Sequence, residues 1–271
     1  MSLSASAVAA ASAAWVWTPP DAEVVEGDEC TILRLPDYVD FDLSVVSFTP
    51  AGPLGPAVDA VLERARAFGL PTLDWQVLIG YPAALAAELS ARGGRVKLDL
   101  EVLAVDLSQG APRLRPPTVG VSPVWATDFA TARDGAAVGV TGFGGELPPD
   151  EQIEELAARS AKAVAAGEGG MVVAYVDGEP AGTGSVKVAD GVARLSGGAV
   201  APSWQGLGVY RAVLDARLSY GVAYGATMAL VKANAATSGP ILRKSGFTPF
   251  GPEPVYAVPL RELPGTSVPG S

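Results

Sequence analysis

Apolar residues in the second half of the chain change their spacing several times, and each change predicts a new element. Residues 150–166 follow two prolines and place Ile153, Leu156 and Val164 at helical spacing among strong helix formers, which predicts an amphipathic helix. Beyond it, short apolar runs are separated by turn residues such as Asp190-Gly191. We therefore expect three antiparallel strands joined by tight turns, at residues 171–176, 181–189 and 192–200.

A glycine-rich segment comes next and leads into a second alternation of helices and strands. Apolar and small residues keep helical spacing through residues 204–225. The remaining pattern predicts a strand at 227–233, a helix at 238–244 that ends at Gly246-Phe247, and a strand at 255–260. This order of elements predicts an α/β (α+β) fold built on a mixed sheet.

The first half of the chain repeats part of this pattern. The segment AVLERARAFGL at 60–70 aligns with AVLDARLSYGV at 212–222, and the same offset places Pro50 on Pro202. With one residue of slippage, Gly93 then falls on Gly246 and the strand pattern at 103–107 falls on 256–260. Agreement across a helix, a helix-ending glycine and a terminal strand predicts two halves of shared topology, with the first half shortened.

A proline-rich segment separates the two halves. Residues 109–118 read QGAPRLRPPT and lack periodic apolar positions, which is typical of a linker. We expect one domain at 1–110, a second at 119–262 and a flexible tail at 263–271.

Composition removes several classes of function. The chain has 29 acidic and 19 basic residues, a net charge of −10, which argues against a nucleic-acid partner. It has no histidine, so a Ser-His-Asp triad and the common catalytic zinc sites are excluded, and we expect no metal. Its single cysteine, Cys30, excludes an internal disulfide. No apolar stretch reaches the roughly 18–20 residues of a membrane span, and no basic leader precedes the first apolar run, so we expect no membrane partner and a cytoplasmic location.

The sequence Gln205-Gly206-Leu207-Gly208 lies where a strand gives way to a helix. The first turn of a helix has unpaired N–H groups that attract anions, and glycine lets a phosphate approach the backbone closely. By itself the pattern is weak, because it is neither G-x-G-x-x-G nor followed by G-K-[ST]. In the first half the aligned stretch carries Pro53 and Pro56, which have no N–H to donate, so we expect no phosphate site there.

Together with its surroundings, the glycine segment resembles the GNAT superfamily of acetyl-CoA-dependent N-acetyltransferases. In that family a strand ends near V-x-P, and [Q/R]-x-x-G-x-[G/A] then opens a helix. Matching residues are Val200, Pro202, Gln205, Gly208 and, at the end of a later helix, Gly246-Phe247. The resemblance covers residues 119–262 and implies a mostly antiparallel sheet. With the repeat, it implies two GNAT-like halves in tandem, the first degenerate and without a cofactor loop.

The resemblance also implies a site for acetyl-CoA as co-substrate, with no metal. The pyrophosphate would bind to the loop and to backbone N–H groups at the start of the helix, and the pantetheine arm to the strand that precedes it. The cofactor-binding residues expected on this basis are Ala199, Val200, Gln205, Gly206, Leu207, Gly208, Val209 and Tyr210. Tyr210 departs from the family, which has Gly or Ala at that position, and its side chain must find room.

The catalytic side chains cannot be assigned in the same way. The family's usual tyrosine acid falls on Leu242, and residues 194–200 lack the frequent glutamate base. The phenols that remain near the expected site are Tyr210, Tyr220, Tyr224 and Tyr256; pattern and repeat place Tyr220 and Tyr256 in the core.

The leading hypothesis is an acyl-CoA N-acyltransferase that moves an acetyl group from acetyl-CoA to a primary amine of a small molecule or peptide by direct attack. One alternative is a non-catalytic acyl-CoA binding or sensing protein, which the missing tyrosine and glutamate would suit. Another is an interaction protein in which both halves are scaffold. The acceptor is open because loops form that side of the site. A monomer with its halves as a pseudo-dimer and a homodimer are both compatible with the repeat.

Overall fold

The computed structural model describes residues 3–19, 21–36 and 43–261 of the 271-residue chain. Contacts divide it into two compact units. The unit that we call the C-terminal unit holds Leu103–Lys232 and Ser238–Pro249, with the first few residues of the chain. The N-terminal unit holds Ala9–Val102, Ala233–Thr237 and the residues from Phe250 onward. The tail predicted at 263–271 lies outside the described residues.

Before the proline-rich segment, the described residues of the first half form three helices and six strands. In chain order they are α1 (Ala5–Ala13), β1 (Glu23–Glu26), β2 (Cys30–Arg34), β3 (Leu43–Phe48), α2 (Leu54–Arg66), β4 (Thr72–Gln76), α3 (Leu85–Ala91), β5 (Arg95–Leu98) and β6 (Leu100–Asp106).

The second half contains every helix and strand that the pattern predicts there. Its elements are β7 (Ser122–Trp125), α4 (Phe129–Phe143), α5 (Asp150–Ala165), β8 (Gly169–Val176), β9 (Glu179–Ala189), β10 (Val192–Val200), a short 3-10 helix η1 (Pro202–Trp204), α6 (Val209–Ala223), β11 (Met228–Asn234), α7 (Ser238–Lys244), β12 (Thr248–Pro252) and β13 (Val255–Pro259). Strand β7, helix α4 and strand β12 are additions that the pattern did not predict.

Helix α4 escaped prediction because its sequence is rich in residues that disfavour helices. It contains several glycines and β-branched residues, which lower helix propensity. Its start is fixed by Asp128, whose carboxylate accepts the Thr131 N–H at 2.9 Å as an N-cap. The glycines allow close packing: a Cβ on Gly142 would lie 2.6 Å from the Cβ of Ala199 on β10. Packing against the sheet, rather than helix propensity, therefore stabilises this helix.

Both sheets follow one topology, which confirms two GNAT-like halves of mixed, mostly antiparallel architecture. In the C-terminal unit, β7, β8, β9 and β10 pair antiparallel in sequence, and β10 then pairs parallel with β11. In the N-terminal unit, β1, β2 and β3 pair antiparallel, and β3 pairs parallel with β4. In each unit a helix, α6 or α2, connects the two parallel strands.

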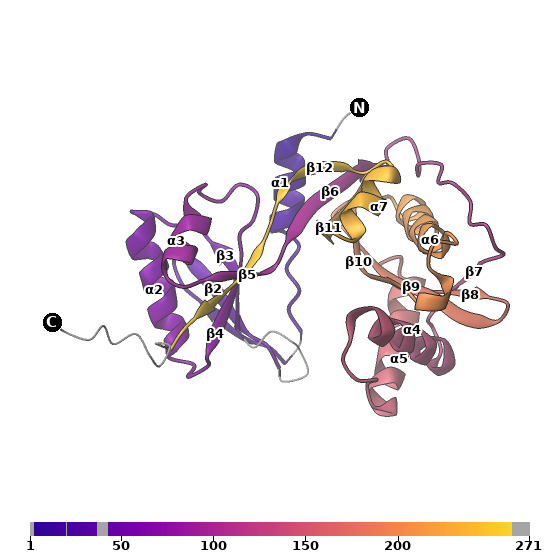
Figure 1. Cartoon of the computed structure of the whole chain (residues 1–271), viewed down its shortest axis with the longest axis horizontal. Coiled ribbons are helices and arrows are strands. Elements are labelled where there is room, and N and C mark those ends of the chain that lie inside the picture. The colour runs from indigo at the N-terminus through magenta and orange to yellow at the C-terminus, as the bar shows by residue number, and fades with distance from the viewer. Residues whose placement is uncertain (1–2, 20, 37–42, 262–271) are drawn as a thin grey trace. The chain divides into compact units, whose positions relative to one another are not determined.

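The last strand of each half is exchanged between the sheets. The seven-stranded sheet has the order β12-β6-β11-β10-β9-β8-β7, and the six-stranded sheet has the order β1-β2-β3-β4-β13-β5. Thus β6 lies beside β11, and β13 lies in the equivalent place beside β4, where Figure 1 shows a yellow strand among purple ones. Neither side of the proline-rich segment holds a complete sheet. The domain boundaries at 110 and 119 remain a prediction.

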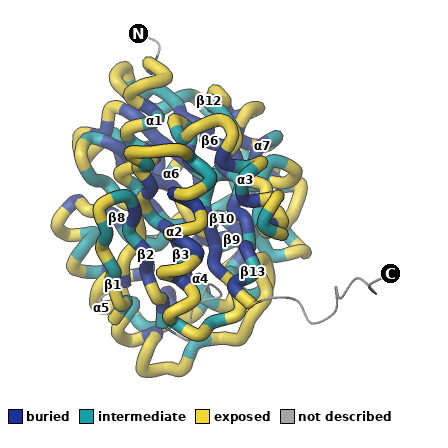
Figure 2. Tube along the Cα trace, turned by 90° about the vertical axis from the view of Figure 1, so that its left-hand side faces the viewer, coloured by how far each residue is buried: buried dark blue, intermediate teal, exposed yellow. Residues whose placement is uncertain are grey.

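In the C-terminal unit the sheet is covered on both faces. On β8, Val172, Ala174 and Val176 pack with Val209 and Val213 of α6. The alternate residue Val173 points to the other face and packs with Ile153 of α5 and its neighbours on α4. This alternation follows from the two-residue period of a strand. The buried residues in Figure 2 accordingly lie along strands such as β9 and β10.

No helix among the described residues is long and apolar enough to cross a membrane.

Candidate functional site

Strand β10 parts from β11 halfway along its length. The parallel ladder joins Val192–Leu195 to Met228–Val231 and stops there. On its other edge, β10 continues along β9 to Val200, with a bulge between Ser196 and Ala199. From Ser196 onward, the edge of β10 that faced β11 therefore has backbone groups outside the parallel ladder. Such an edge can pair with an extended ligand in the way that it would pair with another strand.

The bulge contains two glycines that make room for a bulky neighbour. Gly197 has φ +60°, in the region that favours glycine. A Cβ on Gly198 would lie 3.0 Å from Cε2 and 3.5 Å from Oη of Tyr210. The side chain of Tyr210 thus lies over Gly198. Because residue 198 is a glycine, the strand leaves room for the large side chain of Tyr210, at a position where the family has glycine or alanine.

The loop that leads into α6 has the geometry of an anion site. Gly206 and Gly208 both have positive φ, at +78° and +92°, and Gly208 is the N-cap of α6 with no side-chain cap. The Gln205 side-chain amide donates to the Val200 carbonyl at 3.3 Å, which ties the loop to the end of β10. A Cβ on Gly206 would meet nothing within 4 Å, so the loop is open at that residue. Uncapped N–H groups at a helix start attract anions.

All eight predicted cofactor residues lie in this one place, at the end of β10 and the start of α6. Ala199, Gly208 and Val209 are buried, and Val200, Leu207 and Tyr210 are partly buried, whereas Gln205 and Gly206 are exposed. The predicted contacts are with the backbone, so a buried side chain does not conflict with them. Their role in binding remains a prediction.

Arg217 is a residue that the sequence analysis missed. It is 1% exposed on α6, and its guanidinium donates to the carbonyls of Val213, Ser185 and Ser196 at 3.2–3.3 Å. Its Nη2 has no hydrogen bond within the described part of the chain, and its Cζ lies 6.0 Å from the ring centre of Tyr210. Burial lowers the pKa of Arg217, while the neighbouring Tyr210 acts to raise it. A buried positive charge therefore lies behind the bulge of β10.

Most of the other nearby phenols, and the residue at the position of the family's usual tyrosine acid, are packed against other side chains. Leu242 is fully buried on α7. Tyr220 donates to the Val164 carbonyl at 3.0 Å and accepts the Gly169 N–H at 3.2 Å. Tyr256 is buried in the core of the N-terminal unit, as its pattern predicts. Tyr224 packs against Tyr220, which leaves Tyr210 as the phenol placed against the bulge of β10.

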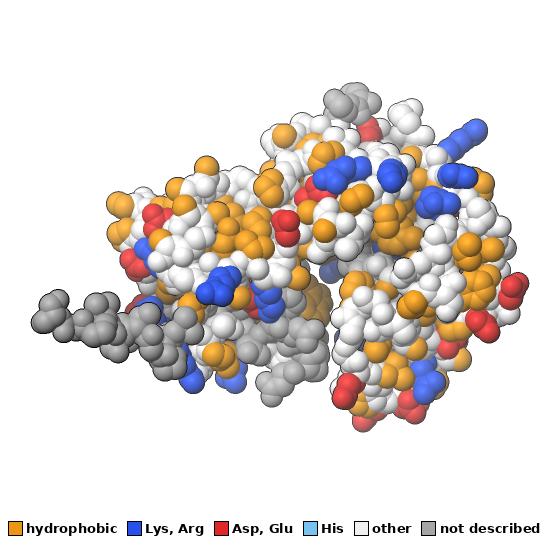
Figure 3. Space-filling model, in the orientation of Figure 1, with side chains coloured by type: hydrophobic (Ala, Val, Ile, Leu, Met, Phe, Trp, Pro, Cys, Tyr) orange, Lys and Arg blue, Asp and Glu red, His pale blue; other side chains and the backbone are white. Residues whose placement is uncertain are grey.

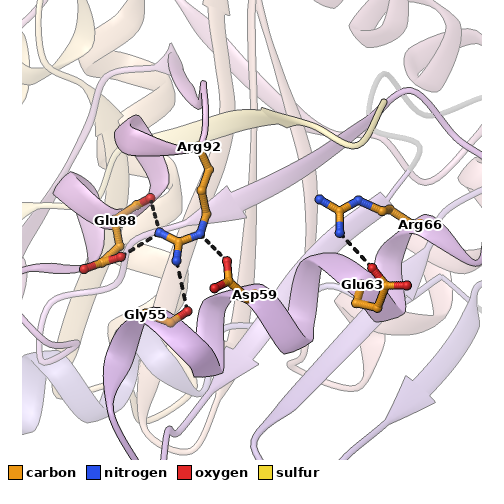
Figure 4. A network of polar contacts seen from close by, with 6 residues as sticks. All are labelled: Gly55, Asp59, Glu63, Arg66, Glu88 and Arg92. Carbon is orange, nitrogen blue, oxygen red and sulfur yellow. Dashed lines mark hydrogen bonds and ion pairs between the residues drawn. The ribbon is translucent and has the colours of Figure 1, made fainter. Parts of the chain in front are cut away.

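In the N-terminal unit, an ion-pair network covers the first turns of the equivalent helix, α2. Helix α2 begins after Pro53. Arg92 donates to Asp59 and Glu88 at 2.6 Å each and to the Gly55 carbonyl at 3.0 Å (Figure 4). Two carboxylates and the guanidinium between them thus lie over the first turns of α2, and their net charge of −1 disfavours a phosphate there. That the first half binds no phosphate remains a prediction.

Comparisons with known proteins agree with this geometry. Residues 132–247 match the model of the acetyltransferase (GNAT) family. A GCN5-related N-acetyltransferase from Kribbella flavida has a TM-score of 0.67 at 18% identity, over 98% of this chain and 97% of that one. A second, from Sphaerobacter thermophilus, has a TM-score of 0.65 at 19% identity, over 89% and 83%.

A tandem GNAT protein from the clavulanic acid biosynthesis pathway has a TM-score of 0.62 at 17% identity, over 94% of this chain and 88% of that one. At these identities the likeness shows the fold. No curated protein matches the sequence. The matched segment contains β10, the glycine loop and α6. The chain thus contains a segment, residues 132–247, that matches the GNAT acetyltransferase family, within a fold that it shares with a tandem GNAT protein.

Proposed function

We propose that this protein transfers an acetyl group from acetyl-CoA to a primary amine of a small molecule or peptide, in its C-terminal unit. The observation that carries the proposal is the coincidence of two features within the segment that matches the family. Strand β10 leaves β11 after Leu195, and the uncapped start of α6 follows its end directly.

The backbone supplies the cofactor contacts in this proposal. The N–H groups of residues 206–210 hold the pyrophosphate, because the loop is open at Gly206 and the helix start favours negative charge. The released edge of β10 at Ala199 and Val200 pairs with the pantetheine arm. Among the described residues no cluster of acidic or cysteine side chains could hold a metal, and this reaction uses none.

In this proposal the reacting atoms lie beside the bulge of β10. The amine nitrogen attacks the thioester carbonyl carbon, and a backbone N–H at the bulge stabilises the negative oxygen. The carbon–sulfur bond then breaks, and the sulfur takes a proton. Tyr210 is the proton donor in this proposal, because its hydroxyl lies against Gly198. The buried charge of Arg217 stabilises negative charge that develops beside it. Water accepts the proton that the amine loses, and a proton from water restores the Tyr210 phenol.

The acyl-CoA sensing protein is the second candidate. The observation that favours it is Leu242, which fills the usual position of the acid with a fully buried aliphatic side chain.

Two measurements on the purified protein separate these functions. Acetyl-CoA at a hundredfold excess over its Kd should stabilise the folded state by about 2.7 kcal/mol, measured by thermal unfolding. Free thiol should be released from acetyl-CoA only when a suitable amine is added, which a panel of small amines and peptides would identify. A sensor would show the stabilisation without thiol release. A protein that shows neither would contradict the proposed function.

A further inference from the structure

The proline-rich segment between the two halves is fastened to the start of α6. The Thr118 N–H and hydroxyl both donate to the Leu207 carbonyl, at 2.8 and 3.1 Å. The side chain of Arg211 on α6 donates to the carbonyls of Arg115 and Pro116, at 2.8 and 3.3 Å. The segment therefore holds a fixed path beside the glycine loop, and we call residues 112–118 the strap.

The strap runs from the end of α7 to the start of α6. At one end, a Cβ on Gly208 would lie 2.7 Å from Cα of Pro117. At the other end, a Cβ on Gly246, just after α7, would lie 3.9 Å from Cβ of Pro112. All of these residues belong to the C-terminal unit.

Exposed cations gather along this path, although the chain as a whole has a net charge of −10. Arg113 and Arg115 are exposed on the strap, and Arg243 and Lys244 are exposed in the last turn of α7. Figure 3 shows Lys and Arg side chains concentrated over the region of α7 and the strap. Cations are favourable in the last turn of any helix, because the carbonyl groups there carry partial negative charge, and this accounts for Arg243 and Lys244. Arg113 and Arg115 belong to no helix, so that explanation does not extend to them.

Neither Arg113 nor Arg115 forms an ion pair within the described residues. Both therefore present a free guanidinium to solvent, beside a loop that is itself proposed to bind a pyrophosphate. A guanidinium binds phosphate oxygens through paired hydrogen bonds, and it keeps its charge at any physiological pH.

We propose that Arg113 and Arg115 of the strap bind the ribose 3′-phosphate of CoA. The inference rests on the proposed function, which places the pyrophosphate on the loop next to Pro117. The adenosine 3′-phosphate lies on the ribose a few bonds from the pyrophosphate and carries close to two negative charges at neutral pH. The strap thus selects CoA over ligands that carry only the pyrophosphate.

The test compares acetyl-CoA with 3′-dephospho-acetyl-CoA, by calorimetric titration of the full chain. The wild type should bind acetyl-CoA at least 10-fold more tightly than the dephospho ligand. The double variant R113A/R115A should lose about 10- to 100-fold of its affinity for acetyl-CoA and at most about 2-fold for the dephospho ligand, since each charge-assisted hydrogen bond is lost only where the phosphate exists. Arg159→Ala, an exposed arginine on α5, is the matched control and should bind both ligands like the wild type.

Equal affinity of the wild type for the two ligands would overturn the inference, and so would an equal loss for both ligands in R113A/R115A. In either case binding itself survives, so the proposed function stands. If neither ligand binds to the wild type, the proposed function fails and this inference fails with it. Because both arginines are exposed, the thermal unfolding of the double variant should match that of the wild type.

Discussion

Replacing Gly206 with aspartate should weaken acetyl-CoA binding at least 100-fold and leave the protein folded. The backbone at Gly206 has φ +78°, which aspartate tolerates better than most residues, and its Cβ would meet no atom within 4 Å. The cost to the folded state is therefore about 1–2 kcal/mol, the usual cost of left-handed backbone for a residue that has a Cβ. The new carboxylate would point into the position proposed for the pyrophosphate and would repel it.

The matched control for this variant is Gly178→Asp, in the turn between β8 and β9. Gly178 also has positive φ, at +85°, and a Cβ there also meets nothing within 4 Å. The two variants should therefore unfold at similar temperatures and differ in calorimetric titration with acetyl-CoA. Equal affinities for acetyl-CoA in the two variants would show that the loop is not the binding site.

Replacing Tyr210 with phenylalanine should lower kcat about 100-fold and change KM little. Only the hydroxyl is lost, so the ring still fills the space over Gly198. General acid catalysis by a placed side chain contributes about 10²- to 10⁴-fold. The guanidinium of Arg217, fully buried nearby, would remain without the phenol that now lies beside it.

Tyr224→Phe provides the control, because Tyr224 ends the same helix with its side chain half exposed. Initial rates of thiol release over a range of acetyl-CoA concentrations are the measurement, because they give kcat and KM separately. A kcat for Tyr210→Phe equal to that of the control would remove Tyr210 from the mechanism.

Local patterns allowed most of the C-terminal unit to be predicted. The strand β10, the loop and α6 follow one another in sequence, so glycine placement and helical spacing were sufficient to find the candidate site. Helix α4 was missed because it is specified by packing: Gly135 and Gly142 let it approach the sheet, and the same glycines weaken the helical pattern.

The exchange of β6 and β13 could not be predicted from the repeat. The two strands have equivalent apolar patterns, so either sheet could accept either strand, and only long-range packing decides between them. The contacts of the strap could not be predicted either, and its sequence predicts only a linker. Its contacts, such as Thr118 with Leu207, join residues far apart in the chain and leave no periodic signal.

The sequence does contain an indication that Arg217 is buried. In the alignment of the two halves its partner is Ala65, which is fully buried in α2. A charged residue at a position where the other copy has a buried alanine indicates a buried charge. Comparison of core positions between the halves would therefore have pointed to the polar group behind the bulge of β10.

A crystal structure of the full chain with acetyl-CoA tests the central claim most directly. The account predicts the pyrophosphate oxygens about 2.7–3.2 Å from backbone nitrogens of residues 206–210, with the pantetheine arm paired to β10 at Ala199 and Val200. Pyrophosphate density at the start of α2, or anywhere other than the α6 loop, would contradict it.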